Sequence, residues 1–545
     1  MFKIVVTILL ICFLSSWIWA NDTKLEVYPA PNGIMKSHNF IVDVSQNGVA
    51  QRSFVYYSTP LDNDADNAKD IQNQVVRGIN SNPVLSEFYA DGKKLPMDTE
   101  QSCSYTCFSF SGKVQVKITG KESISSFKIL PSSAGIVGEV EEGALTFSLE
   151  QPQKLGIVLN GDYLNPLFLF ADASEVGVPD KDAEGTLVIR EGDDCEALKQ
   201  DAKDASVVWF EPGVHDIGVA FQVYEGQTIY LEGGSYLLGT LHGYMAPNVT
   251  IKGRGILAGD AISRKSVLAL KRETGFTKRI VERMRYHGIN MLCAQNDSSW
   301  NAFADYPGMG CDNLVIEGIT IANPRQFFIR ATGVPMTIYN VKMVGSWPYN
   351  TDGFSGIGQA NTTVFDCFFH CNDDAIYVTP DNCHIHHCNF WQGNNGCVFQ
   401  FAWGSAPKTQ GGGFIHDCNI LHLGHVEEAN NRMVFGSRKR GLGDIENIHF
   451  KNINIEGPVW SLIRLETNGG GELGSFRNIT FENIYVTGLV LHKSTVISSK
   501  GKSDDESSTS WIENITLKNI KINDQNITAD DIVIGDFQVE NISVK

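Results

Sequence analysis

Short alternating runs of hydrophobic and polar residues fill the first third of the chain. Residues 40–44, 53–58, 114–118 and 145–149 are examples, and polar turns rich in Gly, Asn and Asp separate them. Amphipathic patterns long enough for helices are scarce in this part. Short strands at such spacing predict a β-sandwich, which we place at residues 21–176.

A different pattern begins after Val207. One unit recurs at intervals of roughly 20 to 36 residues: a polar start, two short alternating runs, and a corner of Gly, Asn or Asp. Copies of the unit begin at Asn248, Asn313, Asn447, Asn478 and Asn514. The stretch 177–205, which precedes the first copy, is rich in Asp, Glu, Lys and Gly and is typical of a linker.

Recurrence of one short unit without intervening helices indicates a solenoid, because each unit can bury its apolar side only against the next. We therefore predict a parallel β-helix over residues 206–545, in which Asn side chains at equivalent corners form hydrogen-bonded ladders. A second sandwich or a propeller is the alternative, although a propeller needs longer four-stranded units. The predicted fold class is all-β, a sandwich followed by a β-helix.

The composition narrows the range of partners. The 545 residues are 42% hydrophobic and 19% charged, which excludes a disordered chain and a coiled coil. The net charge of −18 would repel a phosphate backbone or an anionic lipid surface, so nucleic acid and membranes are poor candidates. We expect a neutral or cationic partner.

Residues 1–20 combine a basic start, a short apolar stretch and small residues near position 20. They predict a cleaved secretory signal rather than a membrane span, which needs roughly 20 apolar residues. A buried N-terminal strand or helix is the alternative. Eight N-x-S/T sequons suit an exported glycoprotein. We expect a secreted, monomeric protein.

Eleven cysteines remain once the predicted signal is removed, and several of them crowd residues 367–418. In an oxidising compartment some should form disulfides, with at least one left over. A zinc site formed by this crowd with His370, His384, His386 and His387 is the alternative, but no C-x2-C pair is present.

The densest group of reactive side chains lies in the middle of the predicted β-helix. Asp352 occurs in Trp-Pro-Tyr-Asn-Thr-Asp-Gly, and Asp373 and Asp374 occur in Cys-Asn-Asp-Asp-Ala-Ile-Tyr. Asp352 and Asp373 are 21 residues apart, about one coil, so stacking should make the two segments lateral neighbours. Adjacent strand residues point to opposite faces, so Asp373 and Asp374 share a groove only if the chain bends there.

Clustered carboxyl groups suit glycoside hydrolysis, in which one protonated acid serves the leaving oxygen and an ionised one activates water. Two charges about 4 Å apart repel by roughly 4 kcal/mol at an effective dielectric constant of 20, so one group is driven towards its protonated form. A solvated turn and a calcium loop are the alternatives. We expect no metal and no cofactor.

Further residues near the acids could complete a sugar site. Aromatic rings stack on the C–H faces of pyranoses, and amide or imidazole groups hydrogen-bond to hydroxyls. The candidates for substrate binding are Trp347, His370, Asn372, Tyr377, Gln400 and Trp403. Core packing is the alternative for each, and His370 suits an orienting role because no Ser or Cys nucleophile accompanies it.

Ordered segments along most of the chain carry a family resemblance. They are Ser53–Pro60, Val208–His215, Ile229–Tyr236, Gly253–Gly259, Thr351–Gly353 and His370–Ile376. In this order they resemble glycoside hydrolase family 49, the dextranases and isopullulanases. Ordered agreement over this length is far more specific than any single motif.

The resemblance implies a sandwich joined to a right-handed parallel β-helix, and hydrolysis of internal α-glucosidic bonds with inversion. By position, Asp373 would be the general acid, and Asp352 and Asp374 would hold and deprotonate the attacking water. The α-1,6 bonds of dextran are the expected target, with pullulan as the alternative. Tyr377 stands where the family's dextranases carry a basic residue, so the resemblance defines the substrate subsites least.

Pectin hydrolases of family 28 are the nearest enzyme alternative, because they share the β-helix and a similar arrangement of acids. They carry Gly-His-Gly and Arg-x-Lys patterns that grip galacturonate. Here Asn395-Gly396 replaces the first, and Arg464-Leu-Glu466 puts an acid in place of the second cation. An acidic protein without those cations suits a polyanion poorly. A non-catalytic, polysaccharide-binding β-helix is the remaining alternative, and the three acids favour the enzyme.

Overall fold

The computed structural model describes most of the chain. The described residues are 23–60, 68–260, 288–292, 311–331, 335–356, 361–378, 382–401, 412–429, 431–439, 444–467, 474–498 and 510–545. The predicted signal at residues 1–20 and the candidate Trp403 lie outside the described residues. No helix in these ranges is long and apolar enough to cross a bilayer.

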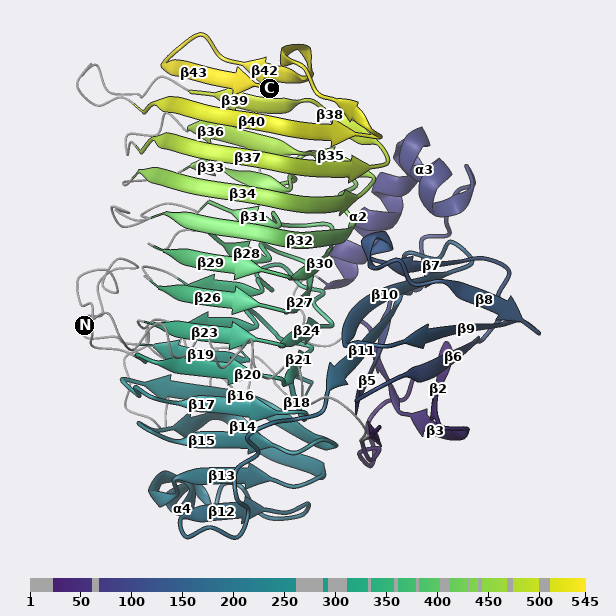
Figure 1. The fold of residues 1–545 in the computed structure, drawn as a ribbon, viewed down its shortest axis with the longest axis vertical. Coiled ribbons are helices and arrows are strands. Elements are labelled where there is room, and N and C mark those ends of the chain that lie inside the picture. Colours follow the sequence, from purple (N-terminus) through teal and green to yellow (C-terminus); the bar gives the residue numbers. More distant parts are fainter. Residues whose placement is uncertain are drawn as a thin grey trace.

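The N-terminal third of the chain contains a β-sandwich of two sheets (Figure 1). The first sheet contains, in order, β1 (Leu25–Val27), β5 (Cys103–Phe110), β11 (Leu167–Ala173), β10 (Gln153–Leu159) and β7 (Phe127–Leu130), with β4 (Val55–Ser58) beside β5. The second contains β3 (Val49–Ser53), β2 (Phe40–Gln46), β6 (Val114–Gly120), β9 (Ala144–Leu149) and β8 (Gly138–Glu141). Alternating apolar residues of the two sheets, such as Val42, Val116 and Leu155, form one buried core. The predicted sandwich is confirmed.

Two helices interrupt the sandwich between β4 and β5, where the sequence pattern indicated strands alone. They are α2 (Ala68–Ser81) and α3 (Pro83–Ala90). Val75 and Ile79, four residues apart on one face of α2, pack against Val426 of the second half of the chain. The helices therefore cover the β-helix rather than the core of the sandwich, which is why the pattern of the sandwich core did not reveal them.

From β12 onward the strands stack in parallel as a β-helix, drawn from teal to yellow in Figure 1. Its coils form three strand ladders. The first ladder contains β12 (Thr186–Ile189), β13 (Val207–Phe210), β15 (Thr228–Leu231), β17 (Thr250–Gly253), β20 (Leu314–Glu317), β23 (Met336–Tyr339), β26 (Thr362–Phe365), β29 (Cys383–His386), β32 (Gly413–Leu423), β34 (Ile445–Glu456), β37 (Phe476–Thr487), β40 (Ile512–Ile522) and β43 (Val539–Val544).

The second ladder contains β14 (Gly213–Val223), β16 (Ser235–Tyr244), β18 (Ile256–Ala258), β21 (Thr320–Ala322), β24 (Lys342–Val344), β27 (Phe368–Cys371) and β30 (Asn389–Gln392), and it continues into the long strands β32 to β40. The third starts at β16 and contains β19 (Ile289–Leu292), β22 (Ile329–Ala331), β25 (Phe354–Gly356), β28 (Ile376–Tyr377), β31 (Phe399–Gln400), β33 (Phe435–Lys439), β36 (Ile463–Thr467), β39 (Ser494–Ile497) and β42 (Ile532–Ile534). Outside the three ladders lie β35 (Val459–Ser461), β38 (Val490–His492) and β41 (Gln525–Asn526).

The stretch 177–205, expected as a linker, already contains part of the β-helix. β12 pairs with β13 in parallel, and α4 (Lys199–Asp204) follows it. The Gln227 side chain donates hydrogen bonds to the carbonyls of Ala202 and Ala205, which fixes α4 at the end of the stack. The charged composition of this stretch concealed one short apolar strand and the helix that covers the first coil.

Asparagines at the corners form the predicted ladders. Asn447, Asn478 and Asn514 have positive φ angles, which Asn tolerates better than most residues. The Nδ2 of Asn478 donates to Oδ1 of Asn447 at 3.0 Å, and Asn514 donates to Asn478 at the same distance. The prediction of corner ladders is confirmed.

The expectation of disulfides is wrong for the part of the chain that the structure describes. The ten cysteines in these ranges are all free and buried. Cys367, Cys388 and Cys418 lie inside the hydrophobic core of the β-helix. Cys103 and Cys107 lie on one strand four residues apart, about 13 Å, too far for a bridge. These residues serve as small apolar side chains, and spacing alone could not distinguish that role.

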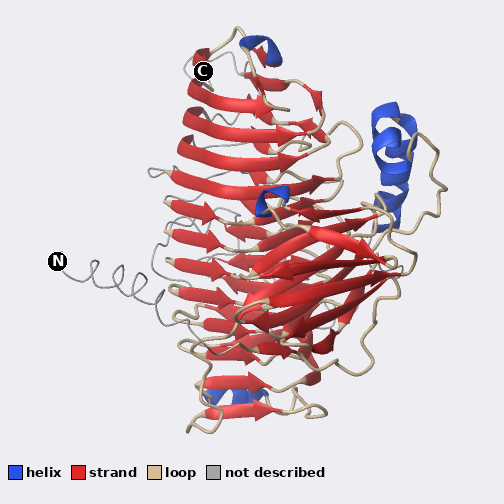
Figure 2. Cartoon of the chain, turned by 45° about the vertical axis from the view of Figure 1, so that its right-hand side comes forward, coloured by secondary structure: helices blue, strands red, loops and turns tan. Residues whose placement is uncertain are grey.

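The sandwich lies against one side of the β-helix (Figures 1 and 2), and its first sheet packs on the second ladder. Phe168 and Phe170 meet Phe368 at ring-centroid distances of 4.9 and 5.0 Å. The contact also contains an ion pair between Lys342 and Asp172, 2.7 Å apart with both side chains 1% exposed. The sandwich is therefore fixed against the coils that carry the three acids.

Candidate active site

The three acids lie in the turns that join the second ladder to the third. Asp352 precedes β25, and Asp373 and Asp374 precede β28 one coil later. The backbone N–H of Gly353 donates to the carbonyl of Asp374 at 3.0 Å, so the two turns stack directly. Coil stacking thus makes the segments neighbours, as the spacing predicts.

One hydroxyl group joins two of the acids. Tyr377 Oη donates to Oδ2 of Asp352 at 2.9 Å and lies 3.3 Å from Oδ2 of Asp374. The other oxygen of Asp374 accepts from the backbone N–H of Cys397 at 2.8 Å and from Gln400 Nε2 at 3.1 Å. Two carboxyl groups within reach of one hydroxyl form a coupled pair.

Asp373 points to a separate set of donors. Its Oδ2 accepts from the backbone N–H of Asn350 at 2.8 Å and from Asn395 Nδ2 at 2.5 Å. Its Oδ1 accepts from the backbone N–H of Asp374 at 2.9 Å, which places the bend that the sequence required between these two residues. Adjacent acids therefore occupy one site with different partners.

The three acids are almost fully buried, and burial shifts the pKa values of Asp352 and Asp373. Asp352, Asp373 and Asp374 are 2%, 6% and 1% exposed. Burial raises the pKa of Asp352 well above its ordinary value, and the charges of the other two acids raise it further. Burial also raises the pKa of Asp373, although its backbone donors and the charge of Arg432 oppose the shift. At least one of these groups therefore holds a proton at a pH where an exposed Asp is ionised.

Two arginines and an asparagine belong to the site, although sequence reasoning did not select them. Arg432, 2% exposed, donates to Oδ1 of Asn395, whose amide nitrogen contacts Asp373. Arg330 lies under the site with its guanidinium 5.1 Å from the Phe327 ring, and its charge lowers the pKa of Asp352. Only the ladder register could have revealed them, because neither lies in a recognisable motif.

Some predicted substrate contacts are occupied by protein. His370 accepts the backbone N–H of Gly345 at its Nδ1, and burial lowers its pKa to about 3. Asn372 donates to the carbonyl of Trp347 at 2.6 Å and accepts from the backbone of Asn394 at 2.9 Å. Both side chains support the turns that carry the acids, which agrees with the orienting role expected for His370.

The other candidates divide between the acids and the sandwich. Tyr377 and Gln400 contact the acids directly. Trp347 donates through Nε1 to Ser58 Oγ of the sandwich at 2.9 Å. A sugar contact by any of them stays a prediction.

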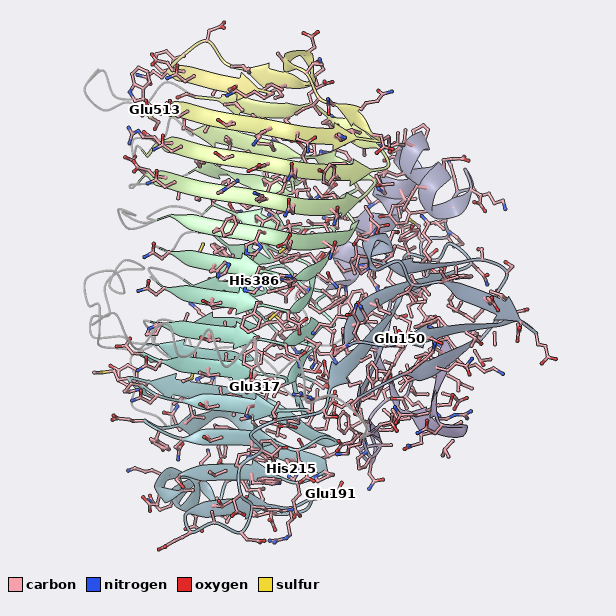
Figure 3. The ribbon with its side chains drawn as sticks, in the orientation of Figure 1. Glu150, Glu191, His215, Glu317, His386 and Glu513 are labelled. Carbon is pink, nitrogen blue, oxygen red and sulfur yellow. The ribbon has the colours of Figure 1, made fainter. Side chains whose placement is uncertain are left out.

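The alternative zinc site does not form among the described residues. No group of three or more His, Cys, Asp or Glu side chains in these ranges is arranged to hold a metal ion. His384 and His386 lie on β29 in the first ladder, where Figure 3 labels His386, whereas His370 lies on β27 in the second. The cysteines point into the core.

Comparison with known proteins finds similarity to dextranases and to one solved structure over nearly the whole chain. No family model matches the chain. A dextranase of Arthrobacter globiformis is 24% identical over 356 residues, which are 53% of this chain and 52% of that protein. A dextranase of Talaromyces minioluteus is 21% identical over 478 residues, 76% of this chain and 72% of that protein. The solved structure of Dex49A from Penicillium minioluteum superimposes with a TM-score of 0.68 at 17% identity, covering 95% and 96% of the two chains.

The chain resembles dextranases. The sequence-based resemblance is thereby confirmed, and the structural match shows the shared fold of sandwich and β-helix. The chain spans about half the length of the Arthrobacter globiformis dextranase and of a second dextranase, from Arthrobacter sp. strain CB-8.

Proposed function

We propose that the chain is an inverting glycoside hydrolase that cleaves internal α-glucosidic bonds of a neutral glucan, foremost the α-1,6 bonds of dextran. The observation that supports this most is the stacking of Asp352 and Asp374 under one tyrosine hydroxyl with Asp373 beside them. Burial raises the pKa of Asp352 and of Asp373, which favours a protonated carboxyl group among the three acids, as a general acid requires.

In this proposal Asp373 donates its proton to the glycosidic oxygen as the C–O bond breaks. It is the most exposed of the three acids, and its partners hold its orientation on one side of the site. Asp352 and Asp374 hold a water between them and remove its proton as it attacks the anomeric carbon from the opposite face. Tyr377 contacts both carboxyl groups of this pair through its hydroxyl.

The pairing of Arg432 and Arg464 favours a neutral substrate over a polyanion. Arg432 is buried and donates to Asn395 and Asn431, and Arg464 is paired with Glu428 and Glu466. An anionic sugar would have to displace these partners. We therefore propose a neutral glucan and disfavour polygalacturonate. The names of the relatives, dextranases, point the same way.

Three further expectations remain part of the proposal: secretion, a monomeric state, and independence from metals and cofactors. Size-exclusion chromatography with light scattering tests the second. Assay after exhaustive chelation tests the third.

The substrate proposal is tested by incubating the purified full chain with dextran, pullulan and polygalacturonate and measuring reducing ends. Release from dextran supports it, and release from pullulan alone moves the linkage to the isopullulanase type. Release from polygalacturonate alone overturns the neutral substrate. An intact fold that releases nothing from any of the three favours the binding protein.

A further inference from the structure

The turn that carries Asp352 touches the N-terminal half of the chain at two points. Trp347 Nε1 donates to Ser58 Oγ, at the end of β4, at 2.9 Å. Tyr349 Oη donates to Gln74 Oε1, on α2, at 2.8 Å. Both contacts lie within the segment 345–352, and both come from elements far away in sequence.

The segment 345–352 is also tied to Asp373. Asn350, which follows Tyr349 directly, gives its backbone N–H to Asp373 Oδ2. A shift of Tyr349 would therefore move a donor of the proposed general acid. Because a hydrogen bond to the ionised carboxyl lowers its pKa, loss of this donor would raise the pKa of Asp373.

Gly345, the first residue of the segment, lies close to Ser58 of the sandwich. Gly345 has φ of +75°, and a Cβ at this position would lie 2.5 Å from Ser58 Oγ and 2.0 Å from Asn323 Oδ1. The backbone thus approaches the sandwich as closely as a residue without a side chain allows. The backbone N–H of Gly345 donates a hydrogen bond to Nδ1 of His370.

A partly open pocket borders the segment. The pocket has a volume of about 70 Å³, lies between α2 and the β-helix, and is lined by Gln72 and Val75 of α2 together with Trp347 and Asn372. Side chains that border a void can move more easily than close-packed ones. The hydrogen bonds to Ser58 and Gln74 therefore restrain a segment that packing alone leaves room to move.

α2 itself is held firmly enough to serve as a support. At Gly78 a Cβ would lie 2.4 Å from Val426 Cγ2, so the helix backbone contacts the β-helix directly. The backbone N–H of Val426 in turn donates to Asn394 Oδ1, in the turn one coil earlier, at 3.2 Å. The helix therefore contacts the turn that contains Val426, which is itself hydrogen-bonded to the turn that contains Asn394.

We propose that the N-terminal half is a positioning part of the active site, in which Gln74 of α2 and Ser58 of β4 hold the segment 345–352 so that Asn350 and Asp352 keep their places around Asp373. This inference rests on the proposed hydrolase function for its catalytic consequence. Gln74 and Ser58 are positioning residues, since they act through Tyr349 and Trp347 and contact no acid.

The test uses the full chain with Gln74→Leu, Tyr349→Phe and the double variant. We expect kcat on dextran to fall about tenfold in each single variant with KM within about twofold, because a small displacement of reacting groups costs rate more than binding. The high-pH limb of kcat/KM should move to higher pH, since Asp373 loses part of the influence that lowers its pKa. The double variant should match either single one, because all three remove the same hydrogen bond.

Hydrogen exchange of a peptide spanning residues 345–353 provides a readout that needs no activity. We expect faster exchange in Gln74→Leu and in Ser58→Ala. Arg77→Gln, an exposed change on the same helix, is the matched control and should alter neither exchange nor the pH profile. Unchanged exchange in Gln74→Leu together with additive effects in the double variant would overturn the inference. A wild type that cleaves no glucan would instead overturn the proposed function, while the exchange data would still decide on positioning.

Discussion

Two parts of the same β-helix use one repeat in different ways. In the C-terminal coils, residues 445–522, long strands of 11 and 12 residues stack in register, and their inward side chains form a mainly apolar core. Their charged side chains pair on the outside, as Glu482 does with Lys518 and His449. In the middle coils, residues 342–400, the strands have two to four residues and the turns between them carry buried acids.

The difference shows where function can enter a solenoid. A regular coil satisfies its corner polar groups by repetition, as the Asn ladders do. The middle coils keep this ladder, since Asn382 donates to Asn361 at 3.2 Å, but the turns between their second and third ladders carry buried carboxyl groups whose pKa is raised by burial. Stability is therefore concentrated in the regular coils, and the electrostatic strain that chemistry needs is concentrated in the interrupted ones.

Asp373→Asn should distinguish the two regions most strongly, because it should reduce kcat far more than it reduces stability. We expect kcat on dextran to fall by about 1,000-fold or more, since a general acid contributes roughly 100- to 10,000-fold. Stability should fall by at most about 3 kcal/mol, because the donors of Asn350 and Asn395 would then face an amide nitrogen. Reducing-end assays and urea unfolding measure the two effects. Activity close to that of wild type would refute the assignment of Asp373.

Phe481→Ala should have the opposite effect: it should reduce stability strongly and leave kcat almost unchanged. Phe481 is fully buried in the C-terminal coils and stacks on Phe450 with ring centroids 5.2 Å apart. Its truncation should cost about 3 to 5 kcal/mol of unfolding free energy. Below the unfolding temperature kcat should stay within about twofold of wild type. A large loss of kcat in a folded variant would mean that the two regions are coupled.

Tyr377→Phe should produce a smaller, local effect. The change removes the hydroxyl that joins Asp352 and Asp374 and leaves the ring in place. We expect kcat to fall roughly 10- to 100-fold and the pKa of Asp352 to rise, because a hydrogen bond that lowers it is lost. The acid limb of the pH–rate profile should move to higher pH if Asp352 acts as a base. An unchanged profile would argue against that role.

The smallest expected effect is a pair of opposite pH dependences of stability. The pKa of Asp352 is raised in the folded state, so wild type loses stability as pH rises above the unfolded value of about 3.9. The stability of Asp352→Asn relative to wild type should therefore rise as pH rises. The pKa of Glu482 is lowered by Lys518, so its contribution exists above pH about 4.5 and disappears on acidification. The stability of Glu482→Gln relative to wild type should fall as pH rises. Thermal unfolding of both variants and of wild type between pH 3.5 and pH 7 measures these trends. Parallel trends in both variants would contradict the contrast.

Sequence patterns predicted the elements that repeat and missed those that do not. The unit starting at Asn447, Asn478 and Asn514 defined the β-helix, because identical coils must place equivalent residues in one ladder. α2 escaped because it packs across the interface between the two halves, which no local periodicity reports. β12 escaped because one short strand in a charged stretch gives too little signal.

In the candidate site, too, the sequence predicted what the repeat determines and missed what it does not. The spacing of Asp352 and Asp373 was enough to predict their meeting, since it equals one coil. Arg432 and Arg330 could not be chosen from sequence, because their approach to the acids depends on which outward positions share a ladder. Gln74 and Ser58 depend on how the sandwich docks, which requires the three-dimensional structure.

The central claim is that coil stacking assembles Asp352, Asp373 and Asp374 into one acid–base site that hydrolyses a neutral α-glucan with inversion. Proton NMR of the first sugar released from dextran by the full chain tests it most directly. The account predicts that the β-anomer appears first and then mutarotates, and that Asp373→Asn releases none. Initial release of the α-anomer, or equal release by the variant, would contradict it.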